Sequence, residues 1–299
     1  MKKGLIFVFT AYAIWGFFPF LFKFLQQAPA IQIVAHRITW SFFFLIMVGY
    51  FRKDIAKIIK ALDKKTILTY SIAGILLSLN WLTYVWGVNS GFIVETSLGY
   101  FINPLVSVLF GVVILRERLR ALQWLPIGIA AIGVAYLTIV YGSLPWIALV
   151  LATTFGTYGL IKKIAPLPSL QGLIIETGTV FIPALIFLFV LESNGSGVFG
   201  HISMSTNLLL IFAGLATAIP LIFFATGAPL VPLSTIGIIQ YIAPTIQFLI
   251  GVFVYHEPFT TSKLIGFSLV WIALIIFTAE GFIHRYRLTH QPGRLKAVV

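Results

Sequence analysis

The chain has 299 residues, of which 60% are hydrophobic and 9% are charged, and its formal net charge is +12. A soluble domain is about 45–50% apolar and about 25% charged, so this composition excludes a water-soluble globule and indicates an all-α polytopic membrane protein. Because the chain contains no cysteine, disulfides, thiol nucleophiles and thiolate metal sites are excluded as well.

Apolar runs long enough to cross a bilayer as helices follow one another along the whole chain. The first run is interpreted as an uncleaved helix, because no small-residue cleavage site follows it. No soluble domain fits between the runs. We predict ten transmembrane helices, at about residues 4–25, 31–51, 66–88, 92–115, 121–140, 145–161, 170–191, 206–228, 232–255 and 261–281.

The positions of Lys and Arg predict the orientation of these spans, because such residues gather in cytoplasmic loops. With a cytoplasmic N-terminus, all 20 Lys and Arg residues except Lys23, Arg37 and Lys263 fall in or beside cytoplasmic segments. We therefore expect both termini in the cytoplasm, and no nucleic-acid partner is needed to explain the net charge. Between the second and third spans, apolar residues at helical spacing in 55–62 predict a short helix on the inner leaflet, with a solvated linker as the alternative.

Two segments that lie 140 residues apart share a pattern of Pro, Leu, Gly, Val and Glu, beginning at Pro104 and Pro244. Five spans are an odd number, so a second copy of such a half enters the membrane in the opposite direction and forms an inverted repeat. We expect the first five-helix repeat at 1–141, the second at 142–283 and a cytoplasmic tail at 284–299. The same separation matches Gly16 with Gly156, Lys23 with Lys163, Gly74 with Gly214, and Gly87 with Gly227.

Helix-disturbing residues at matched positions are the pattern expected beside a transporter's binding site. We expect helix breaks at or near Gly99, Pro104, Gly237 and Pro244.

Six stretches of the sequence carry a resemblance to a known family: AYAIWGFFPFLFK, AHRITWS, NWLTYVWGVNSGFIVETSLGYFINPLVSVLFGVVILRERL, YGLIKK, GLIIETG and STIGIIQYIAPTIQFLIGVFVYHEP. They resemble the RarD branch of the EamA-type transporters, which belong to the drug/metabolite transporter superfamily. The resemblance covers nearly the whole chain. It implies a carrier of the bacterial inner membrane, built from two inverted five-helix halves, with a cavity lined chiefly by helices 1, 3, 4, 6, 8 and 9.

Charged residues inside the spans need partners, because an arginine at the centre of a membrane helix costs about 2.5–3.5 kcal/mol. Arg37 and Glu95 both lie in the outer third and have opposite charges, and Lys23 is a second cation at that depth. We predict that Arg37 and Glu95 interact. A structural ion pair, an outer gate or site for an anionic substrate group, and snorkelling of Arg37 to the headgroups all stay open.

Glu176 lies in the inner third of its span, within reach of Lys162 and Lys163. It is a candidate proton carrier, with a structural, satisfied carboxyl as the alternative. His36, which matches Glu176 in the repeat, is either a titrating group or a neutral, hydrogen-bonded histidine. Glu117 and Glu257 follow the ends of the fourth and ninth spans, and we interpret them as end caps or gate latches.

Uncharged polar and aromatic residues well inside the spans are candidates for the substrate cavity, because polar groups are costly when they face lipid. Aromatic residues near span ends are more often part of the interfacial belt. The candidate lining residues are Tyr12, Trp15, Asn80, Trp81, Tyr84, Tyr100, Asn103, Thr154, Tyr158, Gln240, Tyr241 and Thr245. Such a lining suits a small, partly apolar solute that carries polar groups.

These features favour a secondary carrier that exports small organic metabolites or drug-like solutes by alternating access. Coupling of this transport to protons is one option, and uncoupled transport is the other. The chain has no G-x-x-x-x-G-K-[ST] motif, so direct use of ATP is not expected. It also has no H-E-x-x-H motif or Ser–His arrangement that would indicate an intramembrane enzyme. We expect no cofactor and no metal. The expected partners are a small-molecule substrate and the lipid bilayer; a homodimer, and a non-transporting scaffold or sensor, remain as alternatives.

Overall fold

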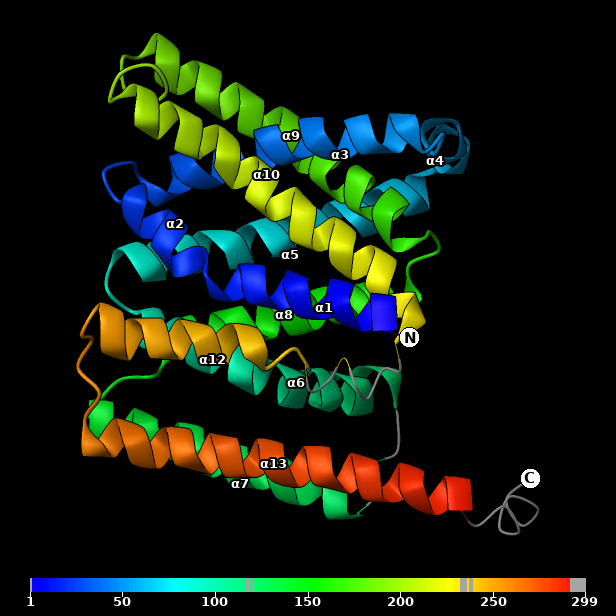
Figure 1. The fold of residues 1–299 in the computed structure, drawn as a ribbon, viewed down its shortest axis with the longest axis vertical. Helices are drawn as coiled ribbons and strands as arrows, with labels where there is room; N and C mark the ends of the chain where they lie inside the picture. The colour runs from blue at the N-terminus through cyan, green and yellow to red at the C-terminus, as the bar shows by residue number, and fades with distance from the viewer. Residues whose placement is uncertain (1, 117–118, 120, 232–235, 237–238, 291–299) are drawn as a thin grey trace.

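The computed structural model describes residues 2–116, 119, 121–231, 236 and 239–290, and within them all regular secondary structure is helical (Figure 1). The helices are α1 (Lys2–Gly16), α2 (Phe18–Phe24), α3 (Ala30–Phe51), α4 (Ile55–Ala61), α5 (Lys64–Asn89), α6 (Ile93–Leu115), α7 (Ala121–Tyr141), α8 (Trp146–Ile164), α9 (Ser169–Ser193), α10 (Met204–Gly227), η1 (Ala228–Leu230), α12 (Ile242–Leu249), η2 (Ile250–Val254) and α13 (Thr261–His290).

Eight helical stretches in the described part are long and apolar enough to cross a membrane, if α1 and α2 are taken together. Two shorter apolar helices, Trp146–Lys162 and Ile242–Val254, accompany them. Large apolar side chains face outward, as with Ile139, which is 80% exposed. A surface of this kind is suited to lipid and not to water.

The long helices run back and forth between two ends of the molecule, so that their connections gather at those ends (Figure 1). The N-terminal end holds Lys2, α4, the α8–α9 connection and the last turns of α13. The opposite end holds the α2–α3, α9–α10 and α12–α13 connections. The observed bounds lie within a few residues of most predicted spans, and α13 continues to His290, past residue 283 where the tail was expected to begin.

The first predicted span is interrupted at Phe17, because Pro19 stands in the first turn of α2. Proline has no N–H to donate to the carbonyl four residues earlier, here that of Trp15. Gln247 of α12 supplies the missing donor: its Nε2 lies 3.0 Å from the Trp15 carbonyl oxygen. The break in the first span therefore provides a contact to α12.

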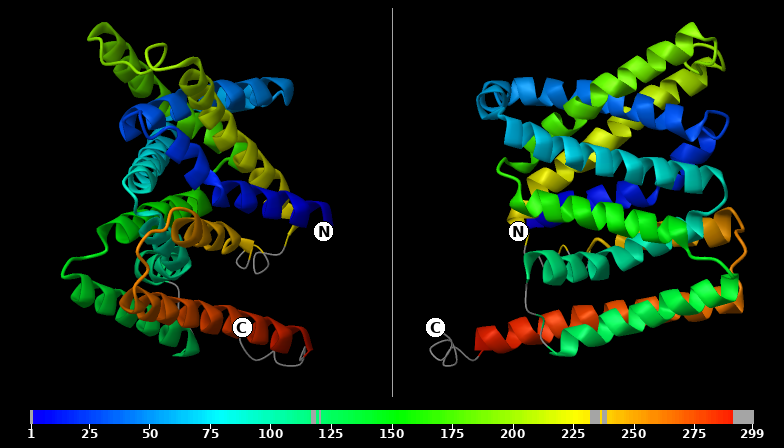
Figure 2. Two further views of the ribbon diagram at one scale, coloured as in Figure 1. Left: turned by 60° about the vertical axis from the view of Figure 1, so that its left-hand side comes forward. Right: turned by 180° about the vertical axis from the view of Figure 1, so that it is seen from behind.

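Helix packing places α3 against both α9 and α10, and α5 against both α8 and α9. α6 packs on α8 and on α12, and α1 packs on α10 and on α12. α7 and α13 lie side by side at one edge of the bundle (Figures 1 and 2). The central helices α3, α5 and α8 therefore lie where several packing surfaces meet.

Two pairs of glycines, matched at the separation of 140 residues, allow helices to approach closely. A Cβ on Gly74 would lie 2.6 Å from the carbonyl oxygen of Glu176, and a Cβ on Gly214 would meet Trp40 and the backbone of Ser41. Glu176 lies on α9 and Ser41 lies on α3, two helices that the separation of about 140 residues also matches. Matched glycines therefore meet matched helices. A Cβ on Gly227 would lie 2.8 Å from Phe7 on α1, whereas a Cβ on Gly87 would meet Thr96 of α6 at 2.6 Å and only touch Ile147 of α8, at 3.5 Å.

The short segment after α3 forms a helix, α4, as predicted. Ile58 is buried in a cluster with Leu45 and Ile174, whereas Ile59 is exposed. Part of the apolar face that we expected to rest on the leaflet therefore packs on the protein. The polar side of this junction centres on Asp54, which accepts hydrogen bonds from Gln171 Nε2 (3.0 Å) and Lys57 Nζ (3.2 Å).

Asp54→Asn is expected to lower the free energy of unfolding at pH 7 by about 1 kcal/mol, through the loss of charge-assisted bonds. Burial alone would raise the pKa of Asp54, but the bonds from Gln171 and Lys57 and the charges of Lys57 and Arg52 hold it below its ordinary value. With a depressed pKa in the folded state, this stabilisation is present above about pH 4 and is lost as the pH falls through the folded value.

Unfolding in detergent, measured between neutral pH and about pH 3, would show this loss in the wild type and not in Asp54→Asn. Asp63→Asn is the comparison variant: asparagine is about as good a cap of α5, but the Thr66 N–H also holds the pKa of Asp63 below its ordinary value, so this variant should lose only the Asp63 share of the pH dependence and retain that of Asp54. Equal pH profiles for the wild type and Asp54→Asn would contradict the assignment.

Candidate functional site

A cavity of about 350 Å³ lies among α1, α2, α3, α5, α6, α8, α9, α10 and α12. This volume is within the range of sites for small organic ligands. Nine of the twelve predicted lining residues border it: Tyr12, Trp15, Asn80, Trp81, Tyr84, Tyr100, Asn103, Tyr158 and Gln240. Thr154, a tenth, is buried beside the wall and bonded to Asn80.

The cavity reaches the N-terminal end of the bundle and stops short of the opposite end. Lys162, Ser169 and Ala225 border it from the terminal turns of α8, α9 and α10 at the N-terminal end. Toward the opposite end, the lining residue Arg37 is still seven residues inside α3, a depth of about 10 Å at 1.5 Å per residue. The described lining therefore reaches the N-terminal end of the bundle and stops inside the helices toward the opposite end.

Hydrogen bonds hold the Asn80 side chain in the wall between three helices. Its Nδ2 donates to the Leu151 carbonyl (3.0 Å) and lies 2.9 Å from Thr154 Oγ1, while the Tyr100 hydroxyl donates to its Oδ1 at 3.0 Å. α5, α6 and α8 are thus linked at the cavity by a satisfied polar cluster, which fixes the Tyr100 ring beside Phe155.

Arg37 lies at the cavity wall and is only 2% exposed. Its Nε donates to Thr217 Oγ1 on α10. Its guanidinium carbon lies 4.3 Å from the Trp81 ring centroid and 5.2 and 5.4 Å from those of Phe18 and Phe22. Cation–π contacts are worth about 0.5–2 kcal/mol each, whereas burying an uncompensated charge costs several kcal/mol.

The predicted pairing of Arg37 with Glu95 is wrong. Glu95 instead borders a second cavity of about 380 Å³ together with Lys263 and Trp146, near the end opposite the N-terminus. Both residues have the expected depth, but their helices turn these side chains toward different neighbours. Lys23, the second cation proposed there, lies with its ammonium 5.3 Å from the Tyr255 ring centroid.

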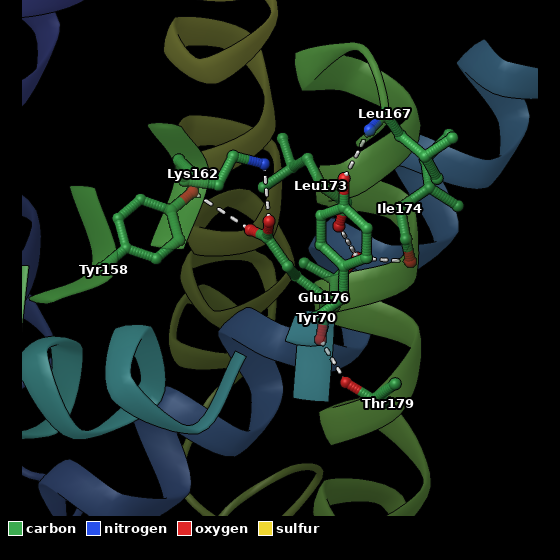
Figure 3. Close-up of polar contacts among 9 residues, drawn as sticks. Tyr70, Tyr158, Lys162, Leu167, Leu173, Ile174, Glu176 and Thr179 are labelled. Carbon is green, nitrogen blue, oxygen red and sulfur yellow. Dashed lines mark hydrogen bonds and ion pairs between the residues drawn. The ribbon is translucent and has the colours of Figure 1, made fainter. Parts of the chain in front are cut away.

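Glu176 is fully buried and paired (Figure 3). Its Oε1 accepts a bond from Lys162 Nζ at 2.6 Å, and its Oε2 accepts one from the Tyr158 hydroxyl at 3.0 Å. The Lys162 ammonium also lies 5.3 Å from the Tyr70 ring centroid, and the Tyr70 hydroxyl accepts a bond from the Leu167 N–H. The expected contact with Lys162 is present; the side chain of Lys163 lies outside the described residues.

At the end opposite the N-terminus, Glu257 joins two distant segments. Its two carboxylate oxygens accept bonds from the backbone N–H groups of Ile93 (2.7 Å) and Val94 (2.8 Å), in the first turn of α6. Burial raises the pKa of this carboxyl, although the two N–H bonds and the charges of Lys23 and Lys263 act in the opposite direction. Glu257 therefore caps α6 from the loop after η2; Glu117 lies outside the described residues.

Two of the predicted cavity residues lie elsewhere. Tyr241 stacks on Phe101 (centroids 6.4 Å apart), and Thr245 is exposed, with its hydroxyl bonded to the Tyr241 carbonyl. Gln240, Pro244 and Gln247 follow one another at helical spacing and border the cavity, so Tyr241 and Thr245 occupy the other face of the same segment. His36 stacks on Phe199, with ring centroids 5.2 Å apart.

The helix breaks predicted at Gly99 and Pro104 are absent from the described structure. α6 runs without interruption through Gly99 and Pro104, and Gly99 instead packs closely on Ala148 of α8. α12 begins just before Pro244, after a turn at Gln240; Gly237 lies outside the described residues. Proline is tolerated in the first turn of a helix, which explains its place in α12.

Some cavity residues were missed by the sequence analysis. Phe18, Thr217, Phe224 and Gln247 all border the cavity. Gln247 could have been found, because it lies seven residues after Gln240 and therefore on the same helical face. Thr217 gives no such signal, since an isolated threonine in a membrane helix commonly bonds its own backbone, as this one does to the Ala213 carbonyl.

Four cavity-lining side chains each have one buried polar atom without a hydrogen-bond partner in the described structure. These atoms are Arg37 Nη1, the Tyr84 hydroxyl, Asn103 Oδ1 and Gln247 Oε1. A buried polar atom without a partner typically costs about 1–3 kcal/mol. Their gathering around one cavity indicates a site for a ligand with complementary polar groups. Among the described residues, no three His, Asp or Glu side chains come together as metal ligands.

Comparisons with known proteins agree on one family. The profile of the EamA-like transporter family matches residues 2–139. The "Uncharacterized transporter YojE" of Bacillus subtilis is 49% identical over 93% of this chain and 94% of its own length. "Protein RarD" of Streptomyces exfoliatus is 44% identical over 93% and 88%, and "Protein RarD" of Escherichia coli K12 is 39% identical over 93% and 95%.

A solved structure titled "Crystal structure of protein" has a similar fold. It aligns with a TM-score of 0.59 over 94% of this chain and 98% of that chain, at 17% sequence identity. An alignment at this identity supports the arrangement of helices alone.

Proposed function

The chain belongs to the EamA-like transporter family as a RarD-type member, and we propose that it is a secondary carrier that exports small organic solutes across the bacterial inner membrane. The relatives are named transporters or RarD proteins, and the chain is a multi-pass helical protein. The one observation that carries the mechanism is the cavity that reaches one end of the bundle and not the other.

We propose ten membrane helices in two inverted repeats, 1–141 and 142–283. The count is supported by eight long apolar helices and two shorter ones. The packing supports the repeat: α1 packs on α10 as α8 packs on α5, and α1 packs on α12 as α8 packs on α6. The matched glycines Gly74 and Gly214 also approach matched helices, with Gly74 against Glu176 of α9 and Gly214 against Ser41 of α3. An inverted repeat supports alternating access, because each half can adopt the other's conformation.

The N-terminal end of the bundle is proposed to face the cytoplasm, since most Lys and Arg residues belong to the segments gathered there. The cavity then opens to the cytoplasm, where an exporter collects its solute. The outer side is closed by the Glu257 bonds to α6 and by Gln32, whose side chain bonds the Ser196 carbonyl and the Val198 N–H. Rocking of one half against the other would break these contacts and form an outward opening.

We also propose that transport is coupled to protons through Glu176. The carboxylate lies among Lys162, Tyr158 and Tyr70 at the cytoplasmic side of the cavity. If Glu176 carries a proton, its carboxylate must be released from Lys162 and Tyr158 during each transport cycle. Glu176→Gln would then remove the dependence of flux on a pH gradient, while a flux that ignores the gradient in the wild type would make the protein a facilitator.

The function is tested with a panel of small aromatic solutes that differ in charge. Solutes that raise the thermal stability of the purified protein are followed by flux into proteoliposomes, in the wild type and in Trp81→Ala. We expect saturable flux in the wild type and weaker binding in Trp81→Ala with expression retained. Stabilisation without flux would support a non-transporting scaffold or sensor, and chemical conversion of a solute would support an enzyme.

A further inference from the structure

The cavity carries one positive charge for which the described residues provide no carboxylate. The chain has eight acidic residues, and Glu117 is the one outside the described part. The Glu176 carboxylate is taken by Lys162 and Tyr158. Glu95 borders the other cavity, and Glu257 caps α6. Of the remaining four, Asp54 and Asp63 lie in connections, Glu192 lies in the last turn of α9 and Glu280 lies on α13, and none of these side chains lines the cavity.

Arg37 is held in place but is not fully satisfied. Its Nε bonds Thr217, and three aromatic rings surround the guanidinium, yet its Nη1 has no hydrogen-bond partner. Aromatic rings offset part of the cost of burying a cation but provide no acceptor for its N–H groups. A planar guanidinium with a free N–H is suited to a carboxylate or a similar oxyanion.

The other unpartnered atoms define what else a ligand should carry. The Tyr84 hydroxyl can donate a second bond to an anionic group near Arg37, since the two side chains share the cavity. Asn103 Oδ1 and Gln247 Oε1 are acceptors, on α6 and α12, and they suit a hydroxyl or an amide N–H on the body of the solute. The Trp15, Trp81 and Tyr100 rings provide apolar surface for that body.

We propose that the cavity selects small organic anions, binding the anionic group at Arg37 and an aromatic or apolar body against the surrounding rings. The inference rests on the proposed carrier function and names the substrate class of the same site. Cations are disfavoured by the charge of Arg37. Zwitterions gain no partner for their ammonium group, because the one carboxylate near the cavity is already paired with Lys162.

The test compares four solutes that share a phenyl body and differ in charge: 3-phenylpropanoate, 3-phenylpropanamide, phenylalanine and 3-phenylpropylamine. Binding to the full-length protein is measured by calorimetry in detergent. We expect 3-phenylpropanoate to bind at least tenfold more tightly than the amide, phenylalanine to bind more weakly than 3-phenylpropanoate, and the amine not to bind. Equal affinity for acid and amide, tighter binding of the amine, or no binding of any of the four overturns the inference.

Binding to variants then tests whether Arg37 causes the preference for the acid over the amide. Arg37→Gln is expected to reduce the ratio of acid to amide affinity to about one, and Arg37→Lys to retain part of it. Lys60→Gln removes one positive charge from an exposed position and should leave the ratio unchanged. An unchanged ratio in Arg37→Gln would also overturn the inference. If that variant does not fold, the wild-type series still decides.

Failure of this inference and failure of the carrier function are distinguishable. Access of a cysteine reagent to the cavity from the two sides of the membrane reports alternation without any solute. Alternation together with equal affinity for acid and amide would leave a carrier with a different selectivity. Tight binding of 3-phenylpropanoate without alternation would leave an anion site in a protein that does not transport.

Discussion

Lys162→Met is expected to lower the free energy of unfolding by about 3–5 kcal/mol, because it leaves the buried Glu176 carboxylate without its cation. Lys162 Nζ lies 2.6 Å from Glu176 Oε1, and the carboxylate side chain is fully buried. Tyr158 would remain as a single neutral donor. Reversible unfolding in mixed micelles, followed by circular dichroism, measures the change.

The double variant Lys162→Met with Glu176→Gln is expected to recover most of this loss, since both charges are then absent. Tyr158→Phe removes only one hydrogen bond and should cost about 0.5–1.5 kcal/mol. Lys60→Met, at an exposed position on α4, is the matched control and should have little effect. A loss in Lys162→Met no larger than in Lys60→Met would contradict a structural role for the pair.

Gly214→Ala is expected to destabilise the protein by about 1–3 kcal/mol or more, as overpacking in a close helix contact does. An added Cβ would lie 2.7 Å from the Ser41 backbone nitrogen and would also meet Trp40. The backbone of α3 cannot move aside as a flexible side chain can, so α10 and α3 would have to separate. The same helices hold Thr217 against Arg37, and solute binding should weaken with the packing.

Gly128→Ala provides the opposite sign for comparison. A Cβ on Gly128 would meet nothing within 4 Å, so alanine should stabilise α7 by up to about 1 kcal/mol through its higher helix propensity. Both variants are compared by the same unfolding measurement. If Gly214→Ala were as stable as Gly128→Ala, the close contact between α3 and α10 would not exist.

The depth of a residue along its helix could be predicted from the sequence, but the direction in which it points could not. Arg37 and Glu95 lie at the expected depths, yet they border different cavities. In a soluble helix, the polar face shows the direction. Here apolar residues cover every face, because one side meets lipid and the other meets protein, so the sequence pattern gives no rotation.

The contact between Lys162 and Glu176 was within reach of the sequence, because both residues stand near the same short connection between α8 and α9. Contacts between distant segments were not. Gln247 bonds the Trp15 carbonyl across 232 positions of sequence, and Glu257 caps α6 across 164. Such pairs depend on how the two halves pack against each other, and the sequence pattern of either half alone does not specify this.

The sequence also does not show which of two neighbouring residues in one segment points into the cavity. Gln240 and Tyr241 were both expected at the cavity, and only Gln240 borders it. Pro244 lies in the first turn of α12, whereas Pro104 lies within an uninterrupted α6. The matching prolines therefore indicated related segments without indicating the same local structure in each.

Alternating access requires that the one cavity be open to each side of the membrane in turn. Because the chain contains no cysteine, Leu77→Cys introduces a single thiol, at a residue that lines the cavity midway along α5. In proteoliposomes of known orientation, a membrane-impermeant maleimide is added to one side at a time, with Lys60→Cys as the control for the cytoplasmic side. We expect labelling of Leu77→Cys from both sides, faster from the cytoplasmic side, in vesicles that remain sealed to the reagent. Labelling from the cytoplasmic side alone, or leakage of the reagent through the protein, would contradict it.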